Sequence, residues 1–106
     1  MQNNYIYRRL TIDDISLVLR LNDDFRTGLV SQENAREFLS NKMNWLIACI
    51  YNNKIIGFAY GYELQRMNNI GNMLYIHEIG VLESFQRQGI GTNILKTIET
   101  ICKLNS

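Results

Sequence analysis

The residues best suited to bind a ligand form a short glycine-bearing turn, Gln86–Thr92, of sequence Gln-Arg-Gln-Gly-Ile-Gly-Thr. The turn joins a strand-like run, Met73–Leu82, to an amphipathic helical run that ends near Leu104. Backbone N–H groups at the start of a helix lack partners within the helix, and the positive end of the helix dipole lies there. Two glycines with one spacer let the backbone approach a bulky anion closely. The spacing therefore predicts a site for phosphate oxygens.

Two well-known classes of nucleotide-binding loop do not fit this turn. A dinucleotide-binding loop carries Gly-x-Gly-x-x-Gly, and Ile94 stands where its third glycine would be. A nucleoside-triphosphate loop carries Gly-Lys followed by Ser or Thr, which the turn lacks. A turn with a purely structural role remains an alternative, because Gly-x-Gly alone is a weak signal.

The composition indicates one globular domain and excludes several partners. Apolar residues make up 46% and charged residues 20% of the 106 residues. A formal charge of +1 without a basic stripe argues against nucleic acid as a partner. No apolar run approaches the roughly 20 residues of a membrane span, and the polar N-terminus is unlike a signal peptide. We therefore expect a cytoplasmic protein with no nucleic-acid or membrane partner.

The residues that could ligate a metal are few and scattered. Cys49 and Cys102 have apolar neighbours and no ligand spacing, and His77 is the single histidine. We expect the two thiols to be buried and reduced, and we expect no metal site.

Capping signals and apolar patterns place the elements of the first half of the chain. Thr11 with the acidic pair Asp13-Asp14 is typical of a helix start, and Ser31 repeats this signal. The predicted elements are a strand over Tyr5–Leu10, a helix from Thr11 to about Asp23, a loop over Phe25–Val30 with Gly28 as a turn residue, and a short helix from Ser31 through Phe38 and Leu39.

The second half of the chain is predicted to form a hairpin, one further strand and a helix. Trp45–Tyr51 and Lys54–Leu64 are strand-like runs joined by Asn52-Asn53, and asparagine tolerates the positive φ of a two-residue turn. A polar loop, Gln65–Asn72, precedes the strand Met73–Leu82. The whole order is β-α-α-β-β-β-α, which predicts a single α/β (α+β) domain. The apolar stripe of the last helix comprises Ile90, Ile94, Leu95, Ile98, Ile101 and Cys102.

With this element order, the sequence resembles the GNAT superfamily of N-acetyltransferases. Their signature for acetyl-coenzyme A (acetyl-CoA), Gln/Arg-x-x-Gly-x-Gly/Ala after a strand, is met by Gln86–Gly91. The resemblance extends over the whole chain, including Gly57-Phe58 in the second strand of the hairpin. The stretch Tyr75–Gly91 is most similar to the aminoglycoside 3-N-acetyltransferase branch. The resemblance implies a mainly antiparallel sheet and transfer of acetyl from acetyl-CoA to an amine.

The resemblance also implies which residues hold the coenzyme. In such enzymes the strand before the signature splays and pairs through its backbone with the pantetheine arm, and Gly80 suits such a close approach. Backbone amides from Arg87 to Thr92 would hold the pyrophosphate, with the side chains of Gln86 and Arg87 as further donors. The implied coenzyme-binding residues are Ile79, Gly80, Val81, Gln86, Arg87, Gln88, Gly89, Ile90, Gly91 and Thr92.

Two adjacent residues of the same strand are candidates for handling the amine. The attacking nitrogen must lose a proton, and His77 and Glu78 lie where family members often carry a proton acceptor. Neighbouring strand residues face opposite sides, so only one should reach the cleft unless a bulge intervenes. Imidazole titrates near neutral pH, whereas a carboxylate needs burial to do so or instead binds a cationic substrate. We expect Glu78 to serve both substrate and proton, with His77 as the alternative.

Family members usually continue past this helix with a strand, a helix and a closing hairpin. Those elements supply the other wall of the coenzyme cleft and often a tyrosine that protonates the leaving thiolate. None of them precedes Ser106, so we expect a truncated fold in which Met73–Leu82 has an open edge. Because open edges pair or aggregate, the sequence predicts a homodimer formed by edge pairing or by packing of the open faces.

Three functions remain open at this point. The first is an N-acetyltransferase acting on a primary amine, such as an aminoglycoside, another small amine or a protein amine. The second is a non-catalytic acetyl-CoA-binding or dimerisation module. The third is a structural domain whose turn binds nothing. Carboxylates of the early helices are typical of a solvated face, so they do not identify the acceptor.

Overall fold

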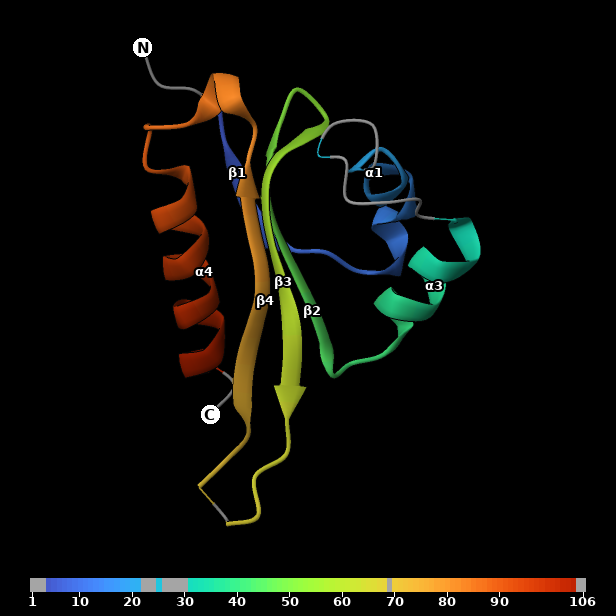
Figure 1. The fold of residues 1–106 in the computed structure, drawn as a ribbon, viewed down its shortest axis with the longest axis vertical. Helices are drawn as coiled ribbons and strands as arrows, with labels where there is room; N and C mark the ends of the chain where they lie inside the picture. The colour runs from blue at the N-terminus through green and yellow to red at the C-terminus, as the bar shows by residue number, and fades with distance from the viewer. Residues whose placement is uncertain (1–3, 22–24, 26–30, 69, 105–106) are drawn as a thin grey trace.

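A four-stranded antiparallel sheet separates one long helix from two shorter ones (Figure 1). The computed structural model describes residues 4–21, 25, 31–68 and 70–104. Each strand pairs with its neighbours in chain order, so the sheet order is β1-β2-β3-β4. The strands are β1 (Ile6–Arg9), β2 (Asn44–Tyr51), β3 (Lys54–Leu64) and β4 (Met73–Val81).

The helices cover opposite faces of this sheet. The long helix α4 (Ile90–Leu104) lies on one face, which we call the α4 side. Helices α1 (Ile15–Leu19) and α3 (Gln32–Ser40) lie on the other, the α1–α3 side. Two short 3₁₀ turns, η1 (Ile12–Asp14) and η2 (Glu83–Phe85), precede α1 and α4. The predicted fold class and the predicted order of elements are confirmed.

The hydrophobic core is divided between the two faces of the sheet. On the α1–α3 side, Phe58 and Leu46 pack with Leu17 and Val18 of α1. On the α4 side, the sheet packs against the apolar stripe of the last helix, as predicted for most of its members. Ile90, Ile94 and Ile98 are buried there, and Ile101 and Cys102 are half-buried.

Leu95 is the exception in that stripe. Its side chain is 46% exposed, so the expectation that it belongs to the buried face is wrong. The helix turns by 100° per residue, which carries Leu95 to the border of the stripe, beyond the reach of the sheet.

Local signals in the sequence located the turns well. Asn52 and Asn53 have φ values of 51° and 59°, which fits the predicted two-residue hairpin turn. The side-chain oxygen of Ser31 accepts a hydrogen bond from the N–H of Asn34 at 3.1 Å and caps α3 as predicted. The first predicted helix is divided: it starts as η1 and continues as α1. The predicted helix end near Asp23 and the turn at Gly28 lie outside the described residues.

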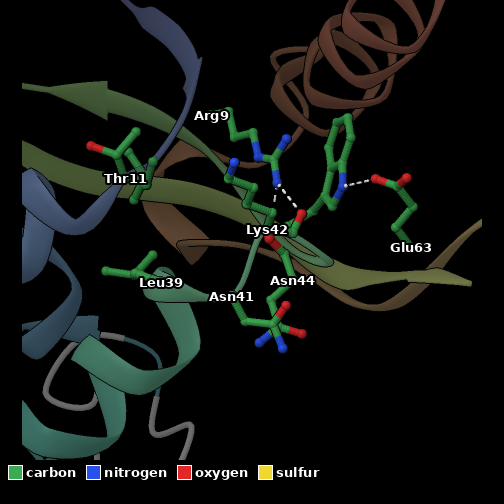
Figure 2. A pocket seen from close by; sticks show the side chains of 9 residues that line it. Arg9, Thr11, Leu39, Asn41, Lys42, Asn44 and Glu63 are labelled. Atoms are coloured by element: carbon green, nitrogen blue, oxygen red, sulfur yellow. Dashed lines mark hydrogen bonds between the residues drawn. The ribbon is translucent and has the colours of Figure 1, made fainter. Parts of the chain in front are cut away.

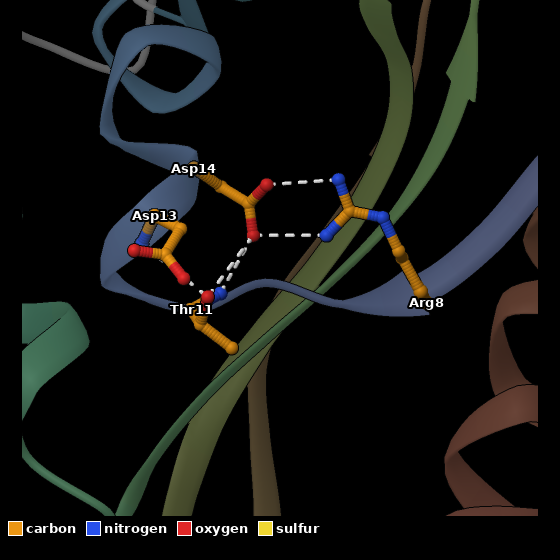
Figure 3. Close-up of polar contacts among 4 residues, drawn as sticks. All are labelled: Arg8, Thr11, Asp13 and Asp14. Atoms are coloured by element: carbon orange, nitrogen blue, oxygen red, sulfur yellow. Dashed lines mark hydrogen bonds and ion pairs between the residues drawn. The ribbon is translucent and has the colours of Figure 1, made fainter.

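A partly buried ion pair joins the first strand to the helix layer (Figure 3). Arg8 donates two hydrogen bonds to the carboxylate of Asp14, at 2.9 Å and 2.8 Å. The N–H of Thr11 donates to the same carboxylate at 2.8 Å, which completes the capping box of η1. Asp14 is only 8% exposed, so these bonds replace the water that its charge would otherwise need. The hydrogen bond from Arg8 is the main cause that lowers the pKa of Asp14, and the bond from Thr11 adds to it.

We predict that Asp14→Asn lowers the free energy of unfolding by about 1–3 kcal/mol at neutral pH, because it leaves Arg8 without a charged partner. The pKa of Asp14 is lower in the folded than in the unfolded state. The stabilisation is therefore complete above the unfolded pKa and is lost as the pH falls through the folded pKa. Denaturant unfolding at pH 7 and pH 3 should show the gap between wild type and variant narrowing in acid. Asp13→Asn, an exposed neighbour, is the control, and an equal gap at both pH values would contradict the assignment.

Candidate functional site

The glycine turn presents a run of unpaired backbone donors at the start of α4. The N–H groups of residues 87–92 donate to no acceptor within the described part of the chain, and the first paired amide is that of Asn93, bonded to Gly89 O at 2.9 Å. Arg87 and Gly89 have φ values of 65° and 80°. Unpaired N–H groups at the start of a helix, together with the positive end of its dipole, bind anions. The geometry fits a phosphate or pyrophosphate group.

Side chains close the turn on its inner side and leave its outer side open. The amide nitrogen of Gln86 donates to the carbonyl of Val81 at 3.0 Å, so this side chain, expected to face a ligand, also braces the turn. Arg87, Gln88 and Gly89 are exposed. A side chain at Gly89 would meet nothing within 4 Å. The turn is therefore open to solvent at residues 87–89.

Strand β4 leads into this turn and forms the edge of the described sheet. Its partner is β3, with Ile79 opposite Ala59 and Val81 opposite Gly57. Ile79 is 44% exposed, on the α4 side. Gly80 lies opposite Phe58, and a Cβ at Gly80 would sit 3.0 Å from the Phe58 ring. Packing of that ring accounts for the glycine at position 80 without any ligand.

A β-bulge in β4 brings both candidate catalytic residues to one face. Glu78 pairs with Tyr60 and Ile76 pairs with Gly61, so His77 is the extra residue between them. The space for the bulge exists because residue 61 is glycine: a Cβ there would lie 1.9 Å from the carbonyl oxygen of Tyr75. The bulge removes the strict alternation that would have separated His77 from Glu78.

The shared face is aromatic and belongs to the α1–α3 side. The ring of His77 lies 5.2 Å from that of Tyr60, 6.1 Å from that of Tyr62 and 6.2 Å from that of Tyr75. Burial raises the pKa of Tyr60, and the nearby charge of Glu78 raises it further. Tyr60 is thus a neutral hydroxyl at physiological pH, while His77 and Glu78 are themselves exposed. The surface combines flat rings, an imidazole and a carboxylate.

The two cysteines take no part in this surface. Cys49 is buried in the sheet, and burial raises the pKa of its thiol, so it is not a thiolate nucleophile. Cys102 is half-buried in α4, and both thiols are free, as predicted. Within the described residues, no three His, Cys, Asp or Glu side chains gather in a group that could hold a metal ion.

A separate pocket of about 460 Å³ lies at the other end of the sheet (Figure 2). Arg9 stacks on Trp45, with its guanidinium carbon 3.9 Å from the ring centre, and donates to the carbonyls of Lys42 and Asn44 at 3.0 Å and 3.1 Å. The indole N–H of Trp45 donates to Glu63 at 3.0 Å. Gly57 of β3 pairs with Val81, close to the glycine turn. Glu63 lies six residues further along β3, about 20 Å from Gly57. Arg9, Trp45 and Glu63 in this pocket are thus engaged in hydrogen bonds within the protein, and the pocket is remote from the turn.

Comparison with known proteins identifies the family. A model of the acetyltransferase (GNAT) family matches residues 15–105. The chain belongs to the GNAT acetyltransferase family. A comparison with curated protein sequences gives no match.

Solved structures of several acetyltransferases share this fold. An aminoglycoside acetyltransferase from an uncultured soil metagenomic sample has a TM-score of 0.83 at 20% identity, over 95% of this chain and 71% of that one. The ribosomal-protein-alanine N-acetyltransferase of Brucella melitensis biovar Abortus 2308 has a TM-score of 0.78 at 14% identity, over 95% and 73%. NAA60 of Arabidopsis thaliana, solved with acetyl-CoA, has a TM-score of 0.69 at 14% identity, over 92% and 67%. At these identities the likeness establishes the fold.

The sequence did not reveal two contacts from the N-terminal segment to the turn. The hydroxyl of Tyr5 donates to the side-chain oxygen of Gln88 at 2.7 Å, and Asn93 donates to the hydroxyl of Tyr7 at 3.4 Å. The one available signal was the pair of tyrosines at alternate positions before and within β1, which is more often a sign of packing.

Among the described helices, none is long and apolar enough to cross a membrane.

Proposed function

We propose that this chain binds acetyl-CoA at the Gln86–Thr92 turn and transfers its acetyl group to a primary amine. The observation that carries the proposal is the run of six unpaired amides, 87–92, at the start of α4 in a member of the GNAT family. A pyrophosphate has oxygens enough to accept from several of these donors, and the helix dipole favours its negative charge. Ile79, Gly80 and Val81 lie on the edge of the sheet beside the turn, where the pantetheine arm would pair with β4.

The acceptor amine belongs, in this proposal, on the aromatic face of β4. A protonated amine is attracted by the carboxylate of Glu78 and by the faces of tyrosine rings. We assign Glu78 the binding of the amine and the removal of its proton, with His77 as the alternative acceptor. Acetyl-CoA supplies the acetyl group as a thioester: the new carbon–nitrogen bond forms as the carbon–sulfur bond breaks. An aminoglycoside or another small amine fits this chemistry, and the 3-N branch remains part of the proposal.

The alternative function is a non-catalytic acetyl-CoA-binding module. It is favoured by the open outer edge of β4, which has a partner on one side only within the described sheet. The two functions share the turn and differ at His77 and Glu78.

The first prediction concerns the charge that the turn holds. Because Gly89 has a φ of 80°, asparagine and aspartate are the substitutions best tolerated there, and they differ only in charge. Gly89→Asp should weaken acetyl-CoA binding at least tenfold more than Gly89→Asn, since the added carboxylate repels the pyrophosphate. Isothermal titration calorimetry measures both dissociation constants. Gly71→Asp is the control, because Gly71 is also exposed with a positive φ but lies in the β3–β4 loop. Equal affinities for the two Gly89 variants would contradict the site.

The second prediction separates a catalyst from a binding module. Glu78→Gln should lower kcat/KM for the amine by about 10²-fold or more, the usual size of proton-transfer catalysis, and leave the acetyl-CoA dissociation constant unchanged. Release of free thiol across a panel of amines that includes aminoglycosides is the measurement. Glu83→Gln, an exposed acid in η2, is the control.

If His77→Gln lowered kcat/KM more than Glu78→Gln, proton removal would be assigned to His77. No thiol release with any amine, together with normal acetyl-CoA binding, would favour the binding module.

We also propose that a second copy of the chain covers the open edge of β4 over residues 73–76 and leaves residues 79–81 to the coenzyme. Supporting this, the first half of β4 exposes apolar side chains on both faces of the sheet, with exposed fractions of 50%, 50% and 37% for Met73, Tyr75 and Ile76. Edge pairing would satisfy the free backbone groups of this part of β4 and cover these side chains.

The prediction is that the chain sediments as a dimer and that Ile76→Lys shifts it to a monomer, because a buried lysine at the interface is costly. Ile12→Lys is the matched control, since Ile12 is 40% exposed but lies in η1. Analytical ultracentrifugation over a range of concentrations measures both. A wild-type monomer at high concentration would exclude this assembly.

A further inference from the structure

Two tyrosines of the N-terminal segment contact the glycine turn from its two ends. The hydroxyl of Tyr5 donates to Gln88, near the first of the unpaired amides, at 2.7 Å. The hydroxyl of Tyr7 accepts from Asn93, the residue directly after the last of them, at 3.4 Å. The amides of residues 89–92 thus lie between two anchoring points, Gln88 and Asn93. Both are contacted by a segment more than 80 residues earlier in the chain.

An aromatic cluster supports the first anchoring point. The ring of Tyr5 lies 5.4 Å from that of Tyr51 and 6.4 Å from that of Phe85, and these two rings lie 5.8 Å apart, all edge to face. Phe85 ends η2, directly before the turn, and Tyr51 ends β2. The cluster therefore ties the N-terminal segment, the end of β2 and the entry to the turn together. Edge-to-face contacts of this kind favour one relative orientation of the rings.

The second anchoring point joins the half-buried Tyr7 to the exposed Asn93. Burial raises the pKa of the Tyr7 hydroxyl, and the hydrogen bond from Asn93 acts in the opposite direction. The hydroxyl is therefore neutral at physiological pH and accepts the hydrogen bond from Asn93. Asn93 is also the residue whose N–H makes the first backbone bond of α4, to Gly89. Tyr7 thus contacts the point at which regular helix pairing starts.

We propose that Tyr5 and Tyr7 are positioning residues that hold the glycine turn in its anion-binding shape before the coenzyme arrives. The assignment rests on the proposed function of the turn. The amides of residues 87–92 have no acceptor in the described chain, so no hydrogen bond from them holds the turn in place. Arg87 also occupies a left-handed conformation that is unfavourable for a residue with a Cβ. Contacts that fix the turn in advance remove this ordering cost from the binding step. Neither tyrosine touches the anion in this assignment.

Tyr5→Phe tests the proposal, because it keeps the ring in the aromatic cluster and removes the hydrogen bond to Gln88. We expect acetyl-CoA to bind threefold to tenfold more weakly, roughly the effect of one net hydrogen bond. Acetyl-pantetheine, which lacks the pyrophosphate, should bind with unchanged affinity. Tyr51→Phe is the matched control: its ring belongs to the same cluster, but its hydroxyl has no hydrogen-bond partner among the described residues. Tyr7→Phe should give a smaller loss, since its bond is longer.

A second readout is independent of the coenzyme. Nitrogen-15 relaxation of the free protein should give lower backbone order parameters for residues 87–89 in Tyr5→Phe than in wild type and Tyr51→Phe. Unchanged order parameters, or an equal loss of affinity for acetyl-CoA and acetyl-pantetheine, would overturn the positioning role. If wild type fails to bind acetyl-CoA while the order parameters still fall, the proposed function is wrong and the bracing of the turn stands.

Discussion

The packing of Ile90 and Ile94 against Gly57 determines where helix α4 begins, and the turn depends on that position. A Cβ at Gly57 would lie 2.9 Å from a methyl group of Ile90 and 3.2 Å from one of Ile94, so the first turn of the helix lies directly on β3. Ile90, the first residue of α4, is 2% exposed. Burial of this residue fixes the N-terminus of the helix beside the end of β4, and the amides before it are thereby held at the sheet edge. If α4 were displaced outward by the width of one methyl group, the turn would no longer lie beside the end of β4.

Strand β4 connects the proposed coenzyme site to the proposed acceptor site, and a single β-bulge in it shapes the acceptor site. Its last residues run into the anion-binding turn, and its bulge places His77 and Glu78 on the same face. The strand is one chain of covalent bonds, so the distance between the acceptor surface and the turn is set by the number of residues between them. Gly61 on the neighbouring strand makes the bulge possible. The geometry of the site is therefore encoded in two adjacent strands rather than in a flexible loop.

The sequence predicts those features that depend on neighbours along the chain. The caps at Thr11 and Ser31, the Asn52-Asn53 turn and the start of α4 follow from local backbone chemistry, and the structure confirms them. The bulge at His77 was not predictable, because it depends on the register against a strand that is distant in sequence. The contact of Tyr5 with Gln88 has the same origin, since no local pattern relates residues so far apart.

Leu95 shows a second kind of failure. Its position in the apolar pattern is correct for a helix, but the extent of the surface that covers the helix is a property of the whole sheet. A pattern of residue types indicates which side chains are suited to burial, whereas the width of the facing layer decides which of them are buried.

The links from Tyr5 to Gln88 and from Tyr7 to Asn93 also have a consequence for folding. They close loops of 83 and 86 residues, so they form only after nearly the whole described chain has collapsed. Contacts of such large sequence separation carry a high entropic cost of loop closure and slow the steps that depend on them. The turn can acquire its final shape only when β1 has joined the sheet and α4 has docked. Ligand affinity at the turn would then report that the two most distant segments of the chain have met.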